Sequence, residues 1–347
     1  MSSTPLKRPA IAAGILFVLA LLSWEFYQRS QGVNISFDDD GPLWAYHRDR
    51  VYQPADQSTV FIGSSRIKFD LDIDTWKSIT GDDPIQLACV GSTPLPVLYD
   101  LADDSDFKGR LIIDVTEGLF FSTNPGNKAR PDKALKYHKD ITPAQRASFV
   151  LNKYLESTFV FLDREDISLN SLMDHWEIPS RPGVIMWPIF SRDFDRVMFN
   201  RQEYMGPLFL ADTTQINKQR SIWALFASMN KKPPINGAPL DSMLQTVKTA
   251  TDKIQSRGGK VLFVRTPSSG PFEEGEGKAF PRDQYWEKIL AVTGCPGIHY
   301  QDFPEISQYQ CPEFSHLTLT DAVDFTKHFI RILQEKHGWK FPKMSSI

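Results

Sequence analysis

The stretch TVFIGSSR, residues 59–66, decides the fold. Its first four residues are β-branched or aromatic, and a glycine and two serines follow at once. A short apolar run that ends in turn residues is typical of a strand buried on both faces of a parallel sheet. Comparable runs occupy residues 85–90, 110–115 and 260–264, with a weaker one at 297–300. We therefore expect about five buried parallel strands.

Helical patterns separate these strands and cover residues 95–101, 240–256, 285–292 and 320–336. The alternation of strand and helix predicts an α/β doubly wound fold. The long stretch from about 125 to 239 has helical periodicity and no obvious buried strand run. Because a structureless loop of that length is implausible in a compact domain, we expect a helical insertion that covers the carboxyl edge of the sheet.

The N-terminus differs from the rest of the chain. Residues 10–24 carry no charge, and Lys7 and Arg8 stand just before them. A helix needs about 17–25 apolar residues to cross a bilayer. This run reaches that length if Glu25 lies at the interface, among the aromatic residues around it. The basic pair predicts that the N-terminus is inside, so we expect an uncleaved anchor over residues 1–30. A cleaved signal peptide and a buried soluble helix are the alternatives.

The anchor divides the chain into three parts. Polar residues 31–58, with an acidic run at 38–40, indicate a solvated tether, and residues 59–345 are expected to form the α/β domain with its insertion. The 347 residues carry a net charge of −3, with 41% hydrophobic and 23% charged residues. These values exclude a disordered or disulfide-dense chain, and they give no reason to expect a nucleic acid as partner.

Three cysteines would reach an oxidising compartment if the chain is exported. Cys295 and Cys311 are close enough in sequence to form a disulfide, whereas Cys89 lies in an apolar run and is expected to be a buried free thiol. No Cys/His spacing typical of zinc is present, so neither a metal nor a cofactor is expected.

Three residues suited to acyl transfer fall at the predicted edge of the sheet. Ser65 follows the first strand on a glycine-containing turn, and His316 stands just before the last helix, with Glu313 three residues earlier. Active sites of open α/β sheets gather at the carboxyl ends of the strands. Ser65 would be the nucleophile, His316 the base and Glu313 the group that orients the imidazole. In the alternative interpretation, Ser64 and Ser65 only cap a helix, His316 is a cap or a core histidine, and Glu313 is a solvated loop acid.

The stretch from Gly63 to Ser65, Gly91 after the second strand, and Glu313 with His316 resemble the blocks of SGNH (GDSL-type) hydrolases. The resemblance extends over all five predicted strands and leaves the insertion outside it. It implies a three-layer, flavodoxin-like parallel sheet. It also implies that Ser65 is the nucleophile and that the backbone amides near Ser65 and Gly91 stabilise the oxyanion.

Some blocks depart from the family pattern. Ser64 and Glu313 stand where the family has Asp, and residues 114–120 lack the Asn that the family uses to stabilise an oxyanion. Thr116 offers a hydroxyl in that segment. Since the loss of one oxyanion donor typically lowers a rate by about 10²–10³, the site is either a divergent one or an inactive relic.

The N-terminal anchor and these departures together make the chain resemble one subgroup of SGNH-like proteins. Its members, such as the alginate O-acetylation proteins and the D-alanyl-transfer protein of teichoic acid synthesis, work beside membrane-bound O-acyltransferases. This resemblance implies a single-pass protein of the cytoplasmic (inner) membrane whose catalytic domain lies in the periplasm or outside the cell. It implies transfer or hydrolysis of an acyl group, expected to be acetyl, on envelope carbohydrate, beside a multi-span acyltransferase partner. The alternatives are an inactive glycan-binding or docking partner of such an enzyme, and a tethered lipid esterase.

Other polar residues near the predicted edge have two interpretations each. Arg66 and Arg265 either bind an anionic substrate group or pair with an acid. Asp114 and Glu117 end the third strand, where paired carboxylates of a glycosidase are a weaker alternative. The aromatic residues of the insertion are expected to form helical core rather than a sugar platform: Trp176, Trp187, Phe190, Trp223 and Phe226.

Overall fold

The computed structural model describes residues 7–52, 58–164, 167–174, 188–229 and 232–343. The chain forms two compact units. The N-terminal unit comprises Met1–Asp38 and Ala147–Ile189, and the sheet unit comprises Asp39–Arg146 and Phe190–Ile347. Parts of the predicted regions lie outside the described residues. They are residues 1–6 of the anchor, 53–57 of the tether, 165–166, 175–187 (with Trp176 and Trp187) and 230–231 of the insertion, and 344–345 of the α/β domain.

The sheet unit contains the parallel sheet that the sequence predicts. Its five strands pair in the order β2-β1-β3-β6-β7, and all the pairs are parallel. The strands are β1 (Thr59–Ile62), β2 (Ile85–Gln86), β3 (Arg110–Asp114), β6 (Lys260–Arg265) and β7 (Gly297–His299). The strand order reverses between β1 and β3, and such a switch point is where open α/β sheets place their sites. The chain is therefore of mixed α/β class with a doubly wound sheet.

β2 is shorter than the predicted run of residues 85–90. The amide side chain of Gln86 turns back along the chain, where its Oε1 accepts the amide of Ala88 at 3.0 Å. The amide of Leu87 donates to the carbonyl of Phe61 at 2.8 Å, so contact with β1 continues beyond the two residues of the regular strand. The amide of Cys89 still donates to the carbonyl of Gly63 at 3.1 Å, so the turns after β1 and β2 are joined.

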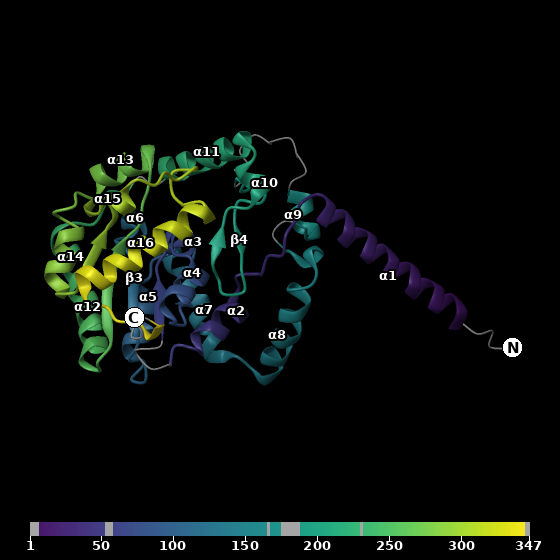
Figure 1. Ribbon diagram of the computed structural model, residues 1–347, viewed down its shortest axis with the longest axis horizontal. Coiled ribbons are helices and arrows are strands. Elements are labelled where there is room, and N and C mark those ends of the chain that lie inside the picture. Colours follow the sequence, from purple (N-terminus) through teal and green to yellow (C-terminus); the bar gives the residue numbers. More distant parts are fainter. Residues whose placement is uncertain (1–6, 53–57, 165–166, 175–187, 230–231, 344–347) are drawn as a thin grey trace. The chain divides into compact units, whose positions relative to one another are not determined.

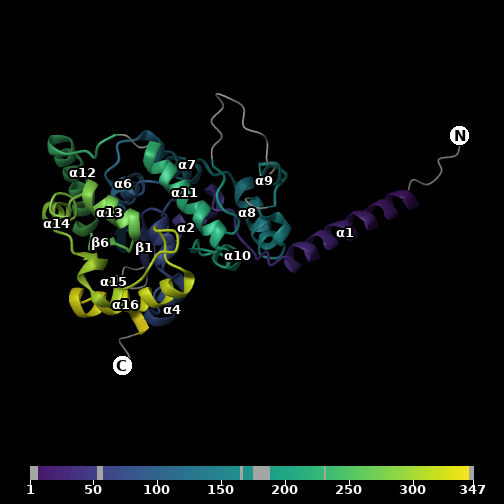
Figure 2. The ribbon, with the colours of Figure 1, turned by 90° about the horizontal axis from the view of Figure 1, so that it is seen from above.

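Two hydrophobic clusters cover the two faces of the sheet. Along β1, Val60 and Ile62 belong to one cluster and Phe61 to the other, as the strand period of two requires. The first cluster is closed by α5 (Leu95–Asp103), α12 (Gly237–Ser256) and α14 (Trp286–Thr293), and the second by α4 (Ile73–Thr80), α15 (Pro304–Ser307) and α16 (Leu319–His337). Figure 2 shows β1 and β6 between these two groups of helices. The sheet unit thus has three layers.

The remaining elements of the sheet unit are shorter or lie at its edges. They are α2 (Gly41–Arg48), α3 (Ser65–Asp70), α6 (Glu117–Phe120), η1 (Pro125–Lys128), α7 (Ala129–Asp140), α10 (Pro207–Leu210), α11 (Thr213–Met229), α13 (Gly270–Ala279) and η3 (Tyr300–Asp302), with an antiparallel pair, β4 (Arg196–Val197) and β5 (Glu203–Tyr204). This pair lies in the stretch where the sequence predicts only helices. Strands of two residues are too short to produce an apolar run.

The N-terminal unit contains α1 (Lys7–Ser30), η2 (Val160–Leu162), α9 (Leu169–Asp174) and most of α8 (Pro143–Glu156) (Figure 1). Among the described residues, α1 is the one helix long and apolar enough to cross a membrane. The segment that qualifies is Arg8–Ser30, within which an 18-residue window has a mean hydropathy of 1.9. A helix is therefore present over residues 7–30 of the predicted anchor.

The acidic run at 38–40 is not a solvated linker, which corrects the prediction. Asp39 accepts hydrogen bonds from Lys68 at 2.5 Å and from Arg201 at 2.6 and 3.0 Å. Asp40 caps α2 by accepting the amide of Leu43. Because buried cations need charged partners, the carboxylate of Asp39 is held within the sheet unit.

The disulfide that the sequence allows between Cys295 and Cys311 is absent, since both thiols are free. Cys295 belongs to the cluster under α12 and α14, whereas Cys311 belongs to the cluster under α16. The sheet lies between the two clusters, which keeps the sulfur atoms apart. Cys89 is a buried free thiol, as predicted.

Candidate active site

Ser65 begins α3, immediately after the turn that ends β1. Ser64 caps this helix, and its hydroxyl accepts the amide of Arg66 at 3.4 Å. A Cβ atom at Gly63 would lie 2.5 Å from Cβ of Asp114 and 2.8 Å from Cγ2 of Ile67. Only glycine fits there, so the chain can turn tightly between β1 and α3. The side chain of Ser65 is partly exposed while its neighbours are buried.

The structure brings Ser65, His316 and Glu313 into one hydrogen-bonded chain. Nε2 of His316 lies 2.8 Å from Oγ of Ser65. Nδ1 of the same ring lies 3.0 Å from Oε1 of Glu313. With Nδ1 protonated and donating to the carboxylate, Nε2 is free to accept the serine proton. The geometry is that of nucleophile, base and orienting acid.

Glu313 is fully buried, and its Oε1 also accepts the amides of Ser315 at 3.1 Å and His316 at 2.7 Å. The turn is tight, and Phe314 within it has a positive φ of 81°. Burial by itself would raise the pKa of the Glu313 carboxyl. The charge of His316 and the hydrogen bonds from His316 and Trp223 outweigh that effect and hold the pKa below its usual range. Glu313 is therefore ionised in the folded protein.

Helix α11 supports this turn from the predicted insertion. Nε1 of Trp223 donates to Oε2 of Glu313. Arg220, one turn earlier, donates to the carbonyl of Pro312 from Nε at 2.9 Å and Nη2 at 2.5 Å, and its guanidinium lies 4.6 Å from the ring of Phe314. Trp223 was expected to be helical core, and nothing in its local sequence indicates a bond to a residue ninety positions away.

The imidazole of His316 is enclosed by aromatic rings and is 2% exposed. The ring centroid of Phe69 lies 4.3 Å away, that of Phe194 6.0 Å and that of Trp223 6.3 Å. Phe194 and Trp223 come from the predicted insertion, so residues of the insertion cover this part of the carboxyl edge. An apolar surrounding excludes water from the base and strengthens its electrostatic contacts.

Asp70 is a second buried carboxyl near His316 that the sequence did not single out. Its Oδ1 accepts the amide of Leu317 at 3.0 Å, while its Oδ2 is buried without a hydrogen-bond partner. Burial is the main reason that the pKa of Asp70 rises to about 7, with the nearby His316 opposing the shift. Asp70 thus ties the residue after His316 to the helix that carries Ser65.

Asp114 joins the ends of β3 and β1. Its Oδ2 accepts the hydroxyl of Ser64 at 3.0 Å and that of Thr116 at 2.9 Å, and the two hydroxyl oxygens lie 2.7 Å apart. Burial raises the pKa of Asp114. Thr116, considered above as an oxyanion donor, therefore has its proton engaged in this network. Asp114 therefore ties the turn that carries Ser64 to the end of β3.

Gly91 lies in the turn after β2, where its backbone is exposed and has a φ of 60°. Open space surrounds the position of a Cβ atom at this glycine. In the part of the chain that the structure describes, no hydrogen bond uses the amide of Gly91 or that of Ser65. Both amides are available to a ligand at the edge of the sheet.

Arg66 and Arg265, considered above as substrate-binding residues, are both buried and paired. Both guanidinium groups donate to the carboxylate of Glu276 on α13, and Arg265 also donates to Glu117 at 3.1 Å. Against the effect of burial, the two arginines lower the pKa of Glu276. Ser268 donates to the same carboxylate at 2.9 Å. The cluster ties the turn after β1 to the turn after β6. It engages Glu117, one of the two carboxyl groups of the glycosidase alternative, while the other, Asp114, is bonded to Ser64 and Thr116.

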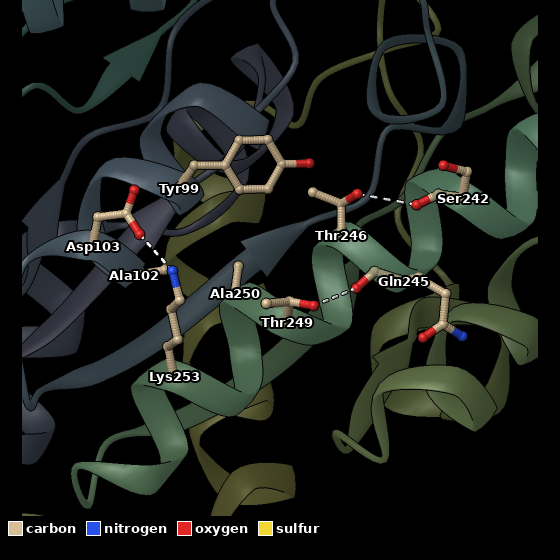
Figure 3. Close-up of a pocket in the computed structure, with 9 residues that line it drawn as sticks. All are labelled: Tyr99, Ala102, Asp103, Ser242, Gln245, Thr246, Thr249, Ala250 and Lys253. Atoms are coloured by element: carbon tan, nitrogen blue, oxygen red, sulfur yellow. Dashed lines mark hydrogen bonds and ion pairs between the residues drawn. The ribbon is translucent and has the colours of Figure 1, made fainter.

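A surface groove of about 510 Å³ lies elsewhere on the sheet unit, between α5 and α12 (Figure 3). An ion pair of 2.7 Å between Lys253 and Asp103 closes one end. Neither Ser65 nor His316 lines this groove, so it is separate from the candidate active site.

Comparison with known proteins finds no family model that matches the chain and no match among curated proteins. The geometry of the site is therefore the basis of the functional argument.

Proposed function

We propose that the protein is a serine-dependent acyltransferase or esterase of the SGNH (GDSL-type) class. One observation carries the proposal: Oγ of Ser65, the imidazole of His316 and the carboxylate of Glu313 lie in one chain of hydrogen bonds of 2.8 and 3.0 Å. Serine hydroxyls are weak nucleophiles unless a base takes their proton, and this arrangement supplies the base and orients it.

The reaction has two half-reactions. Nε2 of His316 takes the proton of Ser65 as Oγ forms a bond to the acyl carbon of the donor. The tetrahedral intermediate then breaks the bond to the leaving oxygen, which receives the proton from His316. In the second half, an acceptor hydroxyl gives its proton to His316 and attacks the acyl-serine. The second tetrahedral intermediate then breaks its bond to Oγ of Ser65, which takes the proton back from His316. A sugar hydroxyl as acceptor completes transfer, and water completes hydrolysis.

The amides of Ser65 and Gly91 are the proposed donors to the oxyanion. Neither amide has another hydrogen-bond partner among the described residues, and both follow strands that end at the same edge. Backbone amides held by a rigid turn stabilise developing negative charge without reorganisation. The ionised Glu313 stabilises the imidazolium that forms at the same moment.

The substrate and location follow from the sequence resemblance. We place α1 across the cytoplasmic membrane, with the sheet unit in the periplasm or outside the cell. The proposed substrate is an acetyl group on envelope carbohydrate, handled beside a multi-span O-acyltransferase. The aromatic residues over His316 favour transfer, because exclusion of water protects an acyl-serine from hydrolysis.

A fluorophosphonate probe tests the nucleophile directly. The full chain in nanodiscs is incubated with the probe, and we expect a single label on Ser65 that is lost in Ser65→Ala. Ser64→Ala is the matched control, because Ser64 is the adjacent serine and its hydroxyl faces Asp114 rather than His316. His316→Ala should slow labelling strongly.

Two outcomes would contradict the proposal. Labelling that persists in Ser65→Ala would place the nucleophile elsewhere. Unchanged envelope acetylation in cells that carry a folded Ser65→Ala variant would exclude catalysis by this site and favour the non-catalytic docking role.

A further inference from the structure

The surface of α8 has an inverted pattern of exposure. Four apolar side chains, Val150, Leu151, Tyr154 and Leu155, are between 38% and 63% exposed. Their spacing puts them on one side of the helix. On the opposite side the polar residues Asn152, Lys153 and Glu156 are half-buried together with Phe149. A helix that turns its apolar side outward indicates a surface that is covered by something other than water.

Helix α9 repeats the pattern on a smaller scale. Leu169, Leu172 and Met173 are 72%, 44% and 59% exposed and recur at helical spacing. Both helices belong to the N-terminal unit, and Figures 1 and 2 both show them beside the carboxyl end of α1. We name these seven side chains of α8 and α9 the apolar stripe.

The segment between the two helices is fastened to α1. The carboxylate of Glu25 accepts the amides of Val160 and Phe161 at 3.2 and 3.1 Å. Arg29 donates to the carbonyl of Thr158 at 2.8 Å and to Glu25 at 2.6 Å. Glu25 and Arg29 lie in the last two turns of the apolar helix, beyond its uncharged run of residues 10–24.

A small core strengthens this attachment. Val33, just beyond α1, is buried together with Val160 and Ile167. The rings of Phe159 and Phe161 lie 5.4 Å apart, and those of Trp24 and Tyr27 stack at 5.8 Å. Aromatic residues are enriched at membrane interfaces, where one side of the ring is apolar and the other is wet. The fastened segment therefore has the composition of an interfacial element.

We propose that the apolar stripe lies on the phospholipid surface of the bilayer, on the side where the carboxyl end of α1 emerges. The proposal rests on the insertion of α1 in the membrane, which is part of the proposed function, and not on catalysis. The hydrogen bonds to Glu25 and Arg29 fix the segment at the interface, and an apolar helix face at that depth is removed from water by lipid. The chain would then hold the membrane by a spanning helix and by two helices that lie on it.

Spin labels test the depth of each position. Single cysteines are introduced by Leu151→Cys on α8 and Leu172→Cys on α9, in the full chain in nanodiscs of phosphatidylethanolamine and phosphatidylglycerol. Phe17→Cys on α1 is the control for lipid, and Gln255→Cys, exposed on α12, is the control for water. The native cysteines are buried and remain in place. Accessibility of each label to oxygen and to a neutral nickel chelate is measured.

We expect the labels at 151 and 172 to favour oxygen over the nickel chelate, with a ratio that approaches the one at position 17. A ratio equal to that at position 255, with position 17 in lipid, would overturn the proposal and leave the anchor intact. Protection of 151 and 172 from both reagents would show that a protein covers the stripe, and this also overturns it. A water-like ratio at position 17 would refute membrane insertion of α1 itself.

Discussion

The hydrogen bond from Trp223 to Glu313 gives the sharpest test of the site. Trp223→Phe keeps an aromatic ring among Phe190 and Phe194, whose centroids lie 5.4 and 6.0 Å from that of Trp223, and removes the indole N–H. Oε2 of Glu313 then loses the donor that the structure gives it, while Oε1 keeps its bonds to the turn. The substitution therefore changes one hydrogen bond to one buried carboxylate.

The size of the effect follows from the charge of the acceptor. A hydrogen bond to a charged group contributes about 1.5–3 kcal/mol. Its loss therefore raises the pKa of Glu313 toward the ordinary value of a glutamate. The pKa of Glu313 in the folded protein is below the ordinary value of a glutamate. The ionised carboxylate therefore stabilises the fold at pH values above that ordinary pKa, and this stabilisation is lost as the pH falls toward the folded pKa. In Trp223→Phe the folded pKa lies closer to the ordinary value, so the carboxylate contributes less stability at neutral pH and the loss is complete at a higher pH.

Activity should change in the same direction. The reactive state needs an ionised Glu313 beside a neutral imidazole, and a more basic carboxylate takes up its proton earlier on acidification. We expect the acid limb of the rate profile for fluorophosphonate labelling to move to higher pH, so that the rate at a given pH on the limb falls about tenfold or more, measured from about pH 3 to about pH 8. The rate on the plateau should change less than the rate on the limb.

Phe226→Leu is the matched control. Phe226 lies on the same helix and packs against Trp223 at 5.9 Å, but it has no bond to Glu313. This variant should lower stability without moving the acid limb. An unchanged limb in a folded Trp223→Phe protein, or the same shift in Phe226→Leu, would refute the role of the indole N–H.

Three further predictions concern the frame around the site. Gly63→Ala places a methyl group 2.5 Å from Cβ of Asp114, and overpacking of this kind costs about 1–3 kcal/mol; a thermal unfolding midpoint equal to that of the wild type would contradict it. As the pH rises from about 4 to about 7, Asp70→Asn should become more stable relative to the wild type, by about 4 kcal/mol at most. The reason is that the raised pKa of Asp70 in the folded protein stabilises the wild type only while the carboxyl is protonated, and this stabilisation is lost at higher pH. Urea unfolding at several pH values measures the difference between the two proteins, and a difference that does not change with pH would refute the prediction. Lys68→Met leaves the buried carboxylate of Glu203 without its cation, which costs about 3–5 kcal/mol by chemical denaturation; a loss below about 1 kcal/mol would show that the ion pair is not needed.

The strands were predictable because they are buried on both faces. Residues 59–62 form an uninterrupted apolar run, and every one of them is buried as β1. The helices from 240 and from 320 show a 3.6-residue pattern because one side of each packs on the sheet. The prediction was wrong about the length of β2, where the side chain of Gln86 bonds to the backbone. It also missed β4 and β5, which are too short to have a pattern.

Charged and thiol side chains were harder to place, because their partners lie far away in the sequence. Asp39 was expected in solvent, but its partners Lys68 and Arg201 lie 29 and 162 residues away. Cys295 and Cys311 are near in sequence and on opposite faces of the sheet. Local composition contains no information about such pairings, which only the fold creates.

Ser65 and His316 were predictable as partners for a topological reason. Ser65 follows the turn at the end of β1, and His316 stands just before α16. The carboxyl ends of parallel strands meet at one edge of the sheet. The geometry around Glu313 was not predictable, although the departure from Asp was visible in the sequence. A buried carboxylate needs donors for both oxygens. The longer side chain of Glu313 folds back, so that Oε1 accepts hydrogen bonds from two amides of its own turn and from the imidazole of His316. Its other oxygen, Oε2, faces the insertion. Trp223 supplies the missing donor. The unusual acid and the insertion helix therefore form one structural feature, and neither can be understood from the sequence without the other.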